Sequence, residues 1–168
     1  MQAIKVLGAQ GSSGLKEGCV SFQINNNTLV DAGNVISELG ESVNEIENIF
    51  ISHAHFDHIR DLPFIIESYY QHRTKPLNIF ASAKTIKAIE QHLFNNTIWP
   101  EFHKLEHPTF NTPLLKFNPF EAGESIILGE NKPYTFTAFN TQHCEGSLGF
   151  VVEYNSQALI LCSDTYVN

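Results

Sequence analysis

The stretch His-Ala-His-Phe-Asp-His, residues 53–58, constrains this chain more than any other part of its sequence. It ends a short apolar run whose length favours a buried strand over a core helix. Residues two apart in an extended chain point the same way, so His53 and His55 can reach one metal ion together. Asp57 and His58 come where the chain turns into a helix, and they are better placed for a second metal ion. Burying so many unpaired polar side chains would cost several kcal/mol, so the cluster predicts a metal site.

Two residues far along the chain also stand at the ends of predicted strands. His143 follows an apolar segment that runs through Phe139, and Asp164 ends the apolar run at residues 158–164. Taken alone, His143 would be interpreted as a surface histidine and Asp164 as a carboxylate that caps a turn. Together with the cluster at residues 53–58, both become candidates for the remaining metal ligands.

The rest of the sequence alternates between strand and helix patterns. Apolar and β-branched runs bounded by turn residues predict strands, and apolar residues recurring three and four apart predict helices. Residues 97–120 hold four of the seven prolines and show no clear period, so we expect an ordered but irregular segment there. The predicted strands are 3–8, 19–24, 28–33, 46–53, 76–82, 134–143, 148–154 and 158–164, and the predicted helices are 57–72, interrupted at Pro63, and 83–96.

Length and composition indicate one soluble domain. The 168 residues are in the range of a single domain, which we expect to span residues 1–168. No apolar run approaches the roughly 20 residues that cross a bilayer, and the first residues do not resemble a signal peptide. We therefore expect a cytoplasmic protein without a membrane partner. The net charge of −8 argues against general binding to nucleic acid, although it leaves room for an anionic substrate held by a metal.

The three cysteines predict neither a disulfide framework nor a thiolate zinc site. Cys19, Cys144 and Cys162 are odd in number, far apart and in no CxxC arrangement. Buried free thiols are the expectation, because free cysteine is among the most buried residue types. Cys144 stands out because it directly follows His143.

These motifs resemble the metallo-β-lactamase fold superfamily, in the order of that family and over nearly the whole chain. The matching segments are Leu-Val-Asp-Ala-Gly at residues 29–33, the cluster at 53–58, residues 142–152 and residues 160–165. The resemblance implies an α/β fold, the αββα four-layer sandwich, with two metal ions. It also implies a ligand set and one supporting residue: His53, His55 and His143 on the first metal, Asp57 and His58 on the second, Asp164 bridging the two, and Asp31 mainly structural.

Within the superfamily the chain is most similar to the class II cyclic-nucleotide phosphodiesterases. The similarity lies in residues 92–102, His-Leu-Phe-Asn-Asn-Thr-Ile-Trp-Pro-Glu-Phe, and in residues 52–69 around the cluster. Phe56 and Asp61 depart from the family, which has Leu and a small residue there. The family also has a further histidine beyond the position of Asp164. A chain without part of the C-terminal half, a partner that supplies the missing half, and a weakly bound second metal would each explain this difference, and we favour the first. The exposed apolar surface of such a chain would favour association, such as a homodimer.

The expected activity is that of a metal-dependent phosphodiesterase. We expect hydrolysis of 3',5'-cyclic nucleotides (cAMP or cGMP) to 5'-monophosphates by a metal-bound hydroxide, with Asp57, His143 and Asp164 as catalytic residues. Zinc is the expected metal at both positions, and the ligands also suit manganese and iron. In the irregular segment, further candidates for contact with the small-molecule substrate are His103, His107 and Trp99.

Other activities remain open. A ribonuclease Z-like tRNA-processing nuclease has a similar ligand motif, but ten basic against eighteen acidic residues give no sign of a basic arm for tRNA. A lactone or thioester hydrolase would use the same metals on a carbonyl group. An alternative from another class is a catalytically silent module that binds metal. The missing histidine leaves this alternative open.

Overall fold

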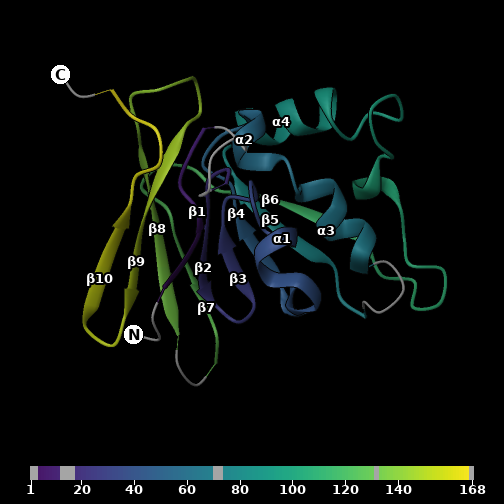
Figure 1. Ribbon diagram of the computed structural model, residues 1–168, viewed down its shortest axis with the longest axis horizontal. Coiled ribbons are helices and arrows are strands. Elements are labelled where there is room, and N and C mark those ends of the chain that lie inside the picture. The colour runs from purple at the N-terminus through teal and green to yellow at the C-terminus, as the bar shows by residue number, and fades with distance from the viewer. Residues whose placement is uncertain (1–3, 12–17, 70–73, 131–132, 167–168) are drawn as a thin grey trace.

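A computed structural model of the protein describes residues 4–11, 18–69, 74–130 and 133–166. Two β-sheets pack face to face, and helices cover the far side of the larger sheet (Figure 1). The larger sheet has six strands in the order β1-β2-β3-β4-β5-β6, and the smaller has four in the order β10-β9-β8-β7. The described residues thus form one helical layer and two sheets of the expected αββα sandwich.

The larger sheet is mixed, and its parallel part sets the position of the candidate site. The first three strands pair antiparallel, and β3 to β6 pair parallel. Carboxyl ends of parallel strands meet at one edge of a sheet, where open α/β sheets bind their ligands. The six strands are β1 (Lys5–Gly8), β2 (Ser21–Asn25), β3 (Thr28–Val30), β4 (Asn48–Phe50), β5 (Leu77–Ala81) and β6 (Leu115–Pro119).

Short helices connect the strands and cover the outer face of this sheet (Figure 1). Pro63 divides the predicted helix 57–72 in two and lies in the first turn of the second part, where its missing N–H is tolerated. The predicted extensions to residue 3 and to residues 70–72 lie outside the described residues. No helix in the described ranges is long and apolar enough to cross a membrane. The helices are α1 (Ile36–Leu39), η1 (Gly40–Glu45), α2 (Phe56–Ile59), α3 (Leu62–Tyr69), α4 (Ala83–His92) and η2 (Phe102–Lys104).

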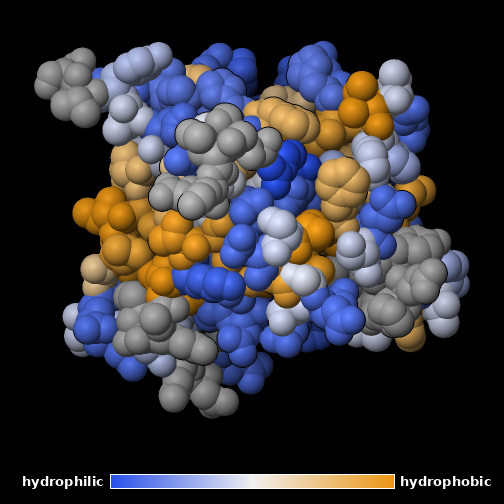
Figure 2. Space-filling model, in the orientation of Figure 1, coloured by the Kyte–Doolittle hydropathy of each residue, from blue (hydrophilic) through white to orange (hydrophobic). Residues whose placement is uncertain are grey.

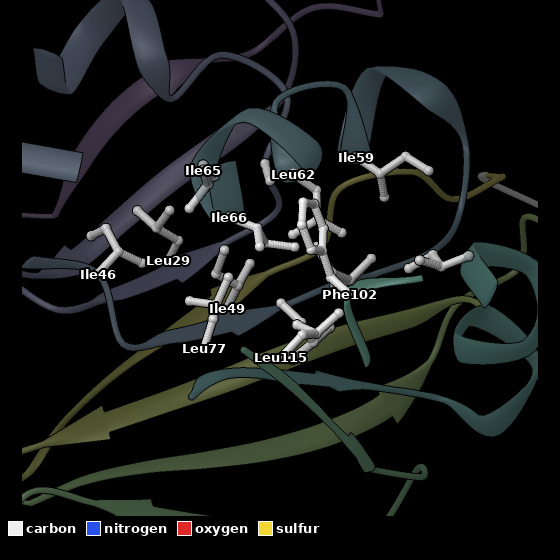
Figure 3. Packing of buried hydrophobic residues seen from close by; sticks show 14 of the residues in the cluster. Leu29, Ile46, Ile49, Ile59, Leu62, Ile65, Ile66, Leu77, Phe102 and Leu115 are labelled. Atoms are coloured by element: carbon white, nitrogen blue, oxygen red, sulfur yellow. The ribbon is translucent and has the colours of Figure 1, made fainter. Parts of the chain in front are cut away.

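One apolar core lies between these helices and the larger sheet (Figure 3). Leu29, Ile49 and Leu77, from β3, β4 and β5, face Leu62 and Ile65 of α3, and all five are fully buried. Each such side chain contributes about 1.5–3 kcal/mol when it leaves water. This core fixes the strands whose ends carry the candidate site.

A second core, rich in phenylalanine, joins the two sheets. Phe50 of β4 stacks on Phe136 of β8 with ring centroids 4.0 Å apart, and on Phe80 of β5 at 4.7 Å. Phe120 and Phe150 meet Phe50 edge-on. Because these rings come from both sheets, they hold the turn between β8 and β9 beside the end of β4.

The outward face of the smaller sheet carries no helix among the described residues. Ile127 and Ile160 on this sheet are 69% and 65% exposed, and apolar surface lies over this part of the molecule in Figure 2. The smaller sheet consists of β7 (Ser125–Leu128), β8 (Tyr134–Asn140), β9 (Leu148–Tyr154) and β10 (Gln157–Leu161).

Candidate metal centre

Three histidine rings meet just beyond the end of β4. Nε2 of His53 lies 2.9 Å from Nδ1 of His55, and Nε2 of His143 lies 3.0 Å from the same Nδ1. Zinc–nitrogen distances of about 2.0–2.1 Å in a tetrahedral site place nitrogen ligands about 3.3–3.4 Å apart. The three nitrogens therefore converge at nearly the spacing that one metal ion requires. The Sγ of Cys144 lies close enough to join this group, which could hold a metal ion.

A second group adjoins the first on the side of α2. Nε2 of His58 lies 3.4 Å from Oδ2 of Asp57 and 3.9 Å from Oδ1 of Asp164. The other oxygen of Asp164, Oδ2, lies 3.4 Å from Nε2 of His143. Asp164 thus faces a histidine of each group. His53, His58 and Asp164 also form a set that could hold a metal ion.

The side chain of His58 provides a test of whether this group of residues fits a cation. Its Nε2 atom is completely buried and has no hydrogen-bond partner, although two carboxylates face it. A buried polar atom that stays unpaired costs about 1–3 kcal/mol. A cation between this nitrogen and the carboxylates would satisfy all three groups, so the residues fit a divalent metal with nitrogen and oxygen ligands.

Asp31 orients His58 from behind. It is fully buried, and its Oδ2 lies 2.8 Å from Nδ1 of His58. Ser52 donates its backbone N–H to Oδ1 at 2.8 Å and its hydroxyl to Oδ2 at 2.9 Å. The backbone of Asp31 is left-handed, with φ of 58°, a conformation that Asp and Asn tolerate better than most residues. The carboxylate fixes the ring and presents Nε2 to the pocket, as supporting residues of metal ligands do.

The pKa values of the buried histidines move in opposite directions. Burial lowers the pKa of His53 to about 3, with a further contribution from the positive charges of the neighbouring imidazoles. The His53 ring is therefore neutral near pH 7, as a metal ligand must be. Burial also disfavours charge on His58, but the hydrogen bond to Asp31 and the adjacent carboxylates outweigh it and raise the pKa of His58.

The turn between β8 and β9, which carries His143, is fastened to the ends of the larger sheet. Leu148 donates its N–H to the carbonyl of Ser52 at 2.9 Å, and the Ser82 hydroxyl donates to the carbonyl of Gly146 at 2.7 Å. Gly146 has φ of 83° and packs against Ser82, so a larger residue would be strained there. These bonds place a segment of the smaller sheet against the 53–58 cluster.

Ser52 and Asp61 are supporting residues that the sequence interpretation did not identify. Ser52 connects Asp31 to the ring of His53, whose Nδ1 lies 3.1 Å from its hydroxyl. Asp61 is buried and accepts the backbone N–H groups of Val35 and Ile36 at 2.7 and 2.9 Å, which begins α1. The only sequence signals were the position of Ser52 before the cluster and the unusual acidic residue at 61.

The three predicted substrate contacts lie in a separate part of the described structure. Trp99 meets Phe64 edge-to-face at 5.3 Å. Nε2 of His103 is 3.8 Å from Glu90 of α4. His107 is buried, and its Nδ1 accepts the N–H of Thr109 at 3.1 Å. These contacts hold residues 97–113 to α3, α4 and themselves rather than to the histidine cluster, so a role in substrate binding stays a prediction.

Comparison with known proteins finds one matching family model and several similar relatives. Residues 14–161 match the family model described as cAMP phosphodiesterases class-II. The chain is 35% identical over 108 residues to a ribonuclease Z of Methanococcus maripaludis, covering 64% of this chain and 31% of the relative. It is 29% identical over 102 residues to a 3',5'-cyclic-nucleotide phosphodiesterase of Candida albicans, covering 61% of this chain and 21% of the relative. The chain therefore spans less than a third of the length of these two relatives.

Solved structures show the same fold. Unliganded yeast PDE1 superposes with a TM-score of 0.74 and 17% identity, over 94% of this chain and 63% of that one. The metallo-β-lactamase fold protein YhfI of Bacillus subtilis superposes with a TM-score of 0.70 and 20% identity, over 94% of this chain and 59% of that one. The fold is therefore that of the metallo-β-lactamase superfamily, as the sequence motifs predicted.

Proposed function

This chain belongs to the class-II cAMP phosphodiesterase family, and from that premise we propose that it acts in the metal-dependent hydrolysis of 3',5'-cyclic nucleotides to 5'-monophosphates. The observation that carries the proposal is the buried, unpartnered Nε2 of His58, which faces two carboxylates beside three converging histidines. These nitrogen and carboxylate groups suit two divalent cations, and two cations suit the hydrolysis of a phosphodiester.

We propose that each metal position is held by a different part of the chain. His53, His55 and His143 would hold the first ion, Asp57 and His58 would hold the second, and Asp164 would lie between them. Imidazole and carboxylate ligands suit zinc, and also manganese and iron. Two bound divalent cations would lower the pKa of a water molecule and stabilise the charge on the phosphoryl oxygens.

The residues of the chain would orient the metal ligands and determine which atoms carry protons. Asp31 would accept a hydrogen bond from Nδ1 of His58, which directs Nε2 toward Asp57 and Asp164, where it would serve as a metal ligand. The depressed pKa of His53 keeps that ring neutral at the pH of most cells. Asp57, whose Oδ2 points to the pocket beside His58, is placed to take up the proton of an attacking water.

Charge favours a small substrate over a long nucleic acid. The net charge of −8 offers no basic surplus for a polyanionic backbone, whereas a cyclic nucleotide carries one negative charge that bound cations can offset. The ribonuclease Z relatives support a second candidate, cleavage of precursor tRNA, because one of them is 35% identical to this chain and the Candida phosphodiesterase is 29% identical. Both candidates are phosphodiester hydrolyses.

The test compares these substrates on one metal-loaded preparation. Metal content by elemental analysis comes first, followed by hydrolysis of cAMP, cGMP and a precursor tRNA with a 3' trailer. We expect two metal ions per chain and turnover of a cyclic nucleotide. His53→Ala should reduce turnover by more than about 100-fold, since losing even a supporting residue of a metal site costs about 10–100-fold.

His92→Ala is the matched control. His92 is an exposed histidine at the end of α4, outside both donor groups, so its loss should leave metal content and turnover unchanged. Cleavage of precursor tRNA without turnover of cyclic nucleotides would establish the second candidate instead. A preparation with no bound metal and no turnover on any substrate would contradict the proposed function.

A further inference from the structure

Cys144 is the one thiol that lies within the candidate metal centre. It follows His143 in the turn between β8 and β9, and its backbone accepts the N–H of Ser147 at 3.1 Å. Its own N–H donates to the Ser147 hydroxyl at 3.4 Å. This closed turn sets where the thiol lies, and the turn itself is fastened to the end of β4 through Leu148.

The sulfur atom joins the three-histidine group. Its Sγ and one ring nitrogen each of His53, His55 and His143 all lie within 4.8 Å of one another. Zinc–sulfur and zinc–nitrogen distances of about 2.3 and 2.0–2.1 Å correspond to a sulfur–nitrogen separation of about 3.6 Å in a tetrahedral site. The limit of 4.8 Å exceeds that separation by little more than 1 Å, so a shift of about that size at most would bring the thiol to ligand distance.

A second observation, independent of the thiol, indicates that the residues beside it fit a cation. His58 is fully buried, its Nε2 has no hydrogen-bond partner, and its ring packs 4.1 Å from the ring of His53. The atom points to Asp164, which also faces His143. The thiol thus adjoins, through His53, a second group of residues that a cation would satisfy.

We propose that Cys144 is an exchangeable ligand of the three-histidine group, which takes the fourth position in place of Asp164 or a water molecule, an inference that rests on the metal site of the proposed function. On binding, the S–H bond breaks heterolytically, the sulfur lone pair forms the bond to the metal, and the proton leaves to water. Three imidazoles and a thiolate fill all four coordination positions of a zinc ion, whereas a catalytic zinc site keeps one coordination position for water or substrate. The thiolate therefore competes with substrate for the first ion and selects a thiophilic metal such as zinc over manganese.

Cobalt(II) provides the probe, because its spectrum distinguishes sulfur from nitrogen ligands. We expect the metal-free wild-type protein to develop visible ligand-field bands together with an intense near-ultraviolet thiolate-to-cobalt band on titration. Cys144→Ser should keep the visible bands and lose the near-ultraviolet band. Cys162→Ser, which removes an exposed thiol outside the donor group, should keep both.

Three outcomes overturn the inference, and the first two leave the proposed function standing. Visible bands without a near-ultraviolet band in the wild type, or a near-ultraviolet band that survives in Cys144→Ser, would remove Cys144 as a ligand and leave the metal site standing. Absence of all cobalt bands would contradict both the metal site and the inference.

A measurement on the wild-type chain avoids any dependence on the folding of variants. Alkylation by iodoacetamide, followed by peptide mass spectrometry, reports each thiol separately. Added zinc should protect Cys144 and leave the rate at Cys162 unchanged. Equal alkylation of Cys144 with and without zinc, in a chain shown by elemental analysis to hold the metal, would refute the inference.

Discussion

Replacing Asp31 would measure how much the network behind His58 stabilises the protein. Asp31 is fully buried and interacts with the N–H and hydroxyl of Ser52 and with Nδ1 of His58, at 2.8 to 2.9 Å. Asp31→Ala leaves a buried N–H without an acceptor, which costs about 1–3 kcal/mol. Removing one partner of a buried ion pair costs about 3–5 kcal/mol. Because both losses belong to one network, they overlap, and we expect the free energy of unfolding to fall by about 3–5 kcal/mol in total.

Asp31→Asn is the matched variant. Asparagine tolerates the left-handed backbone at this position, and its amide oxygen can still accept the N–H of Ser52. It loses the negative charge, so we expect a smaller cost of about 1–2 kcal/mol, comparable to one hydrogen bond. Both variants should also weaken metal binding, by about 10–100-fold, because they release the ring of His58.

Urea unfolding of the metal-free proteins, followed by circular dichroism and extrapolated linearly to water, measures these differences. A cost below about 1 kcal/mol for Asp31→Ala would refute the reasoning, because it is less than the penalty for one unpaired buried donor. Equal costs for alanine and asparagine would also refute it, since the retained acceptor would then contribute nothing.

Three further predictions concern the histidine cluster, the approach of α2 and the core between the sheets. Because the pKa of His53 is lowered to about 3, the unfolded metal-free chain binds a proton there below about pH 6.5 that the folded chain does not. This contribution to stability is present above that pH and is lost as the pH falls. From about pH 7 to about pH 5, the free energy of unfolding measured in urea should therefore decline less for His53→Gln than for the wild type. Gly33→Ala places a Cβ against the backbone carbonyl of Asp57, so we expect the free energy of unfolding to fall by about 1–3 kcal/mol. Elemental analysis of this variant should find fewer than two metal ions per chain. Phe136→Ala should lower the free energy of unfolding by about 3–5 kcal/mol, whereas Ile127→Ala, at an exposed position, should change it by less than about 0.5 kcal/mol; similar costs for both would contradict the assignment of the core.

Much of the candidate site follows from local sequence rules. The alternation of an extended chain predicts that His53 and His55 face one point, and the structure brings their nitrogens within 2.9 Å. His143 and Asp164 were singled out because each follows an apolar strand, and the structure places both beside the cluster. Their role as ligands stays a prediction.

What the sequence did not predict depends on contacts between distant segments. The strand β6 lies inside the segment expected to be irregular, and β7 was not predicted at all. Both are short, at five and four residues, and β6 ends at a proline, so their sheet neighbours rather than their own patterns determine them. The bonds from Ser52 to Asp31 join residues 21 apart, which no local pattern indicates.

The stack of Phe50 on Phe136 has a consequence for how this protein would respond to its surroundings. Three nitrogens from two different sheets meet only while those sheets remain docked, so a metal ion bound by all three would bind the docked form alone. An ion present at about 100 times its dissociation constant adds about 2.7 kcal/mol to such a form. That is comparable to the burial of one large apolar side chain, at about 1.5–3 kcal/mol. The local supply of divalent metal would then set how much of the chain persists in its folded state, and so its abundance.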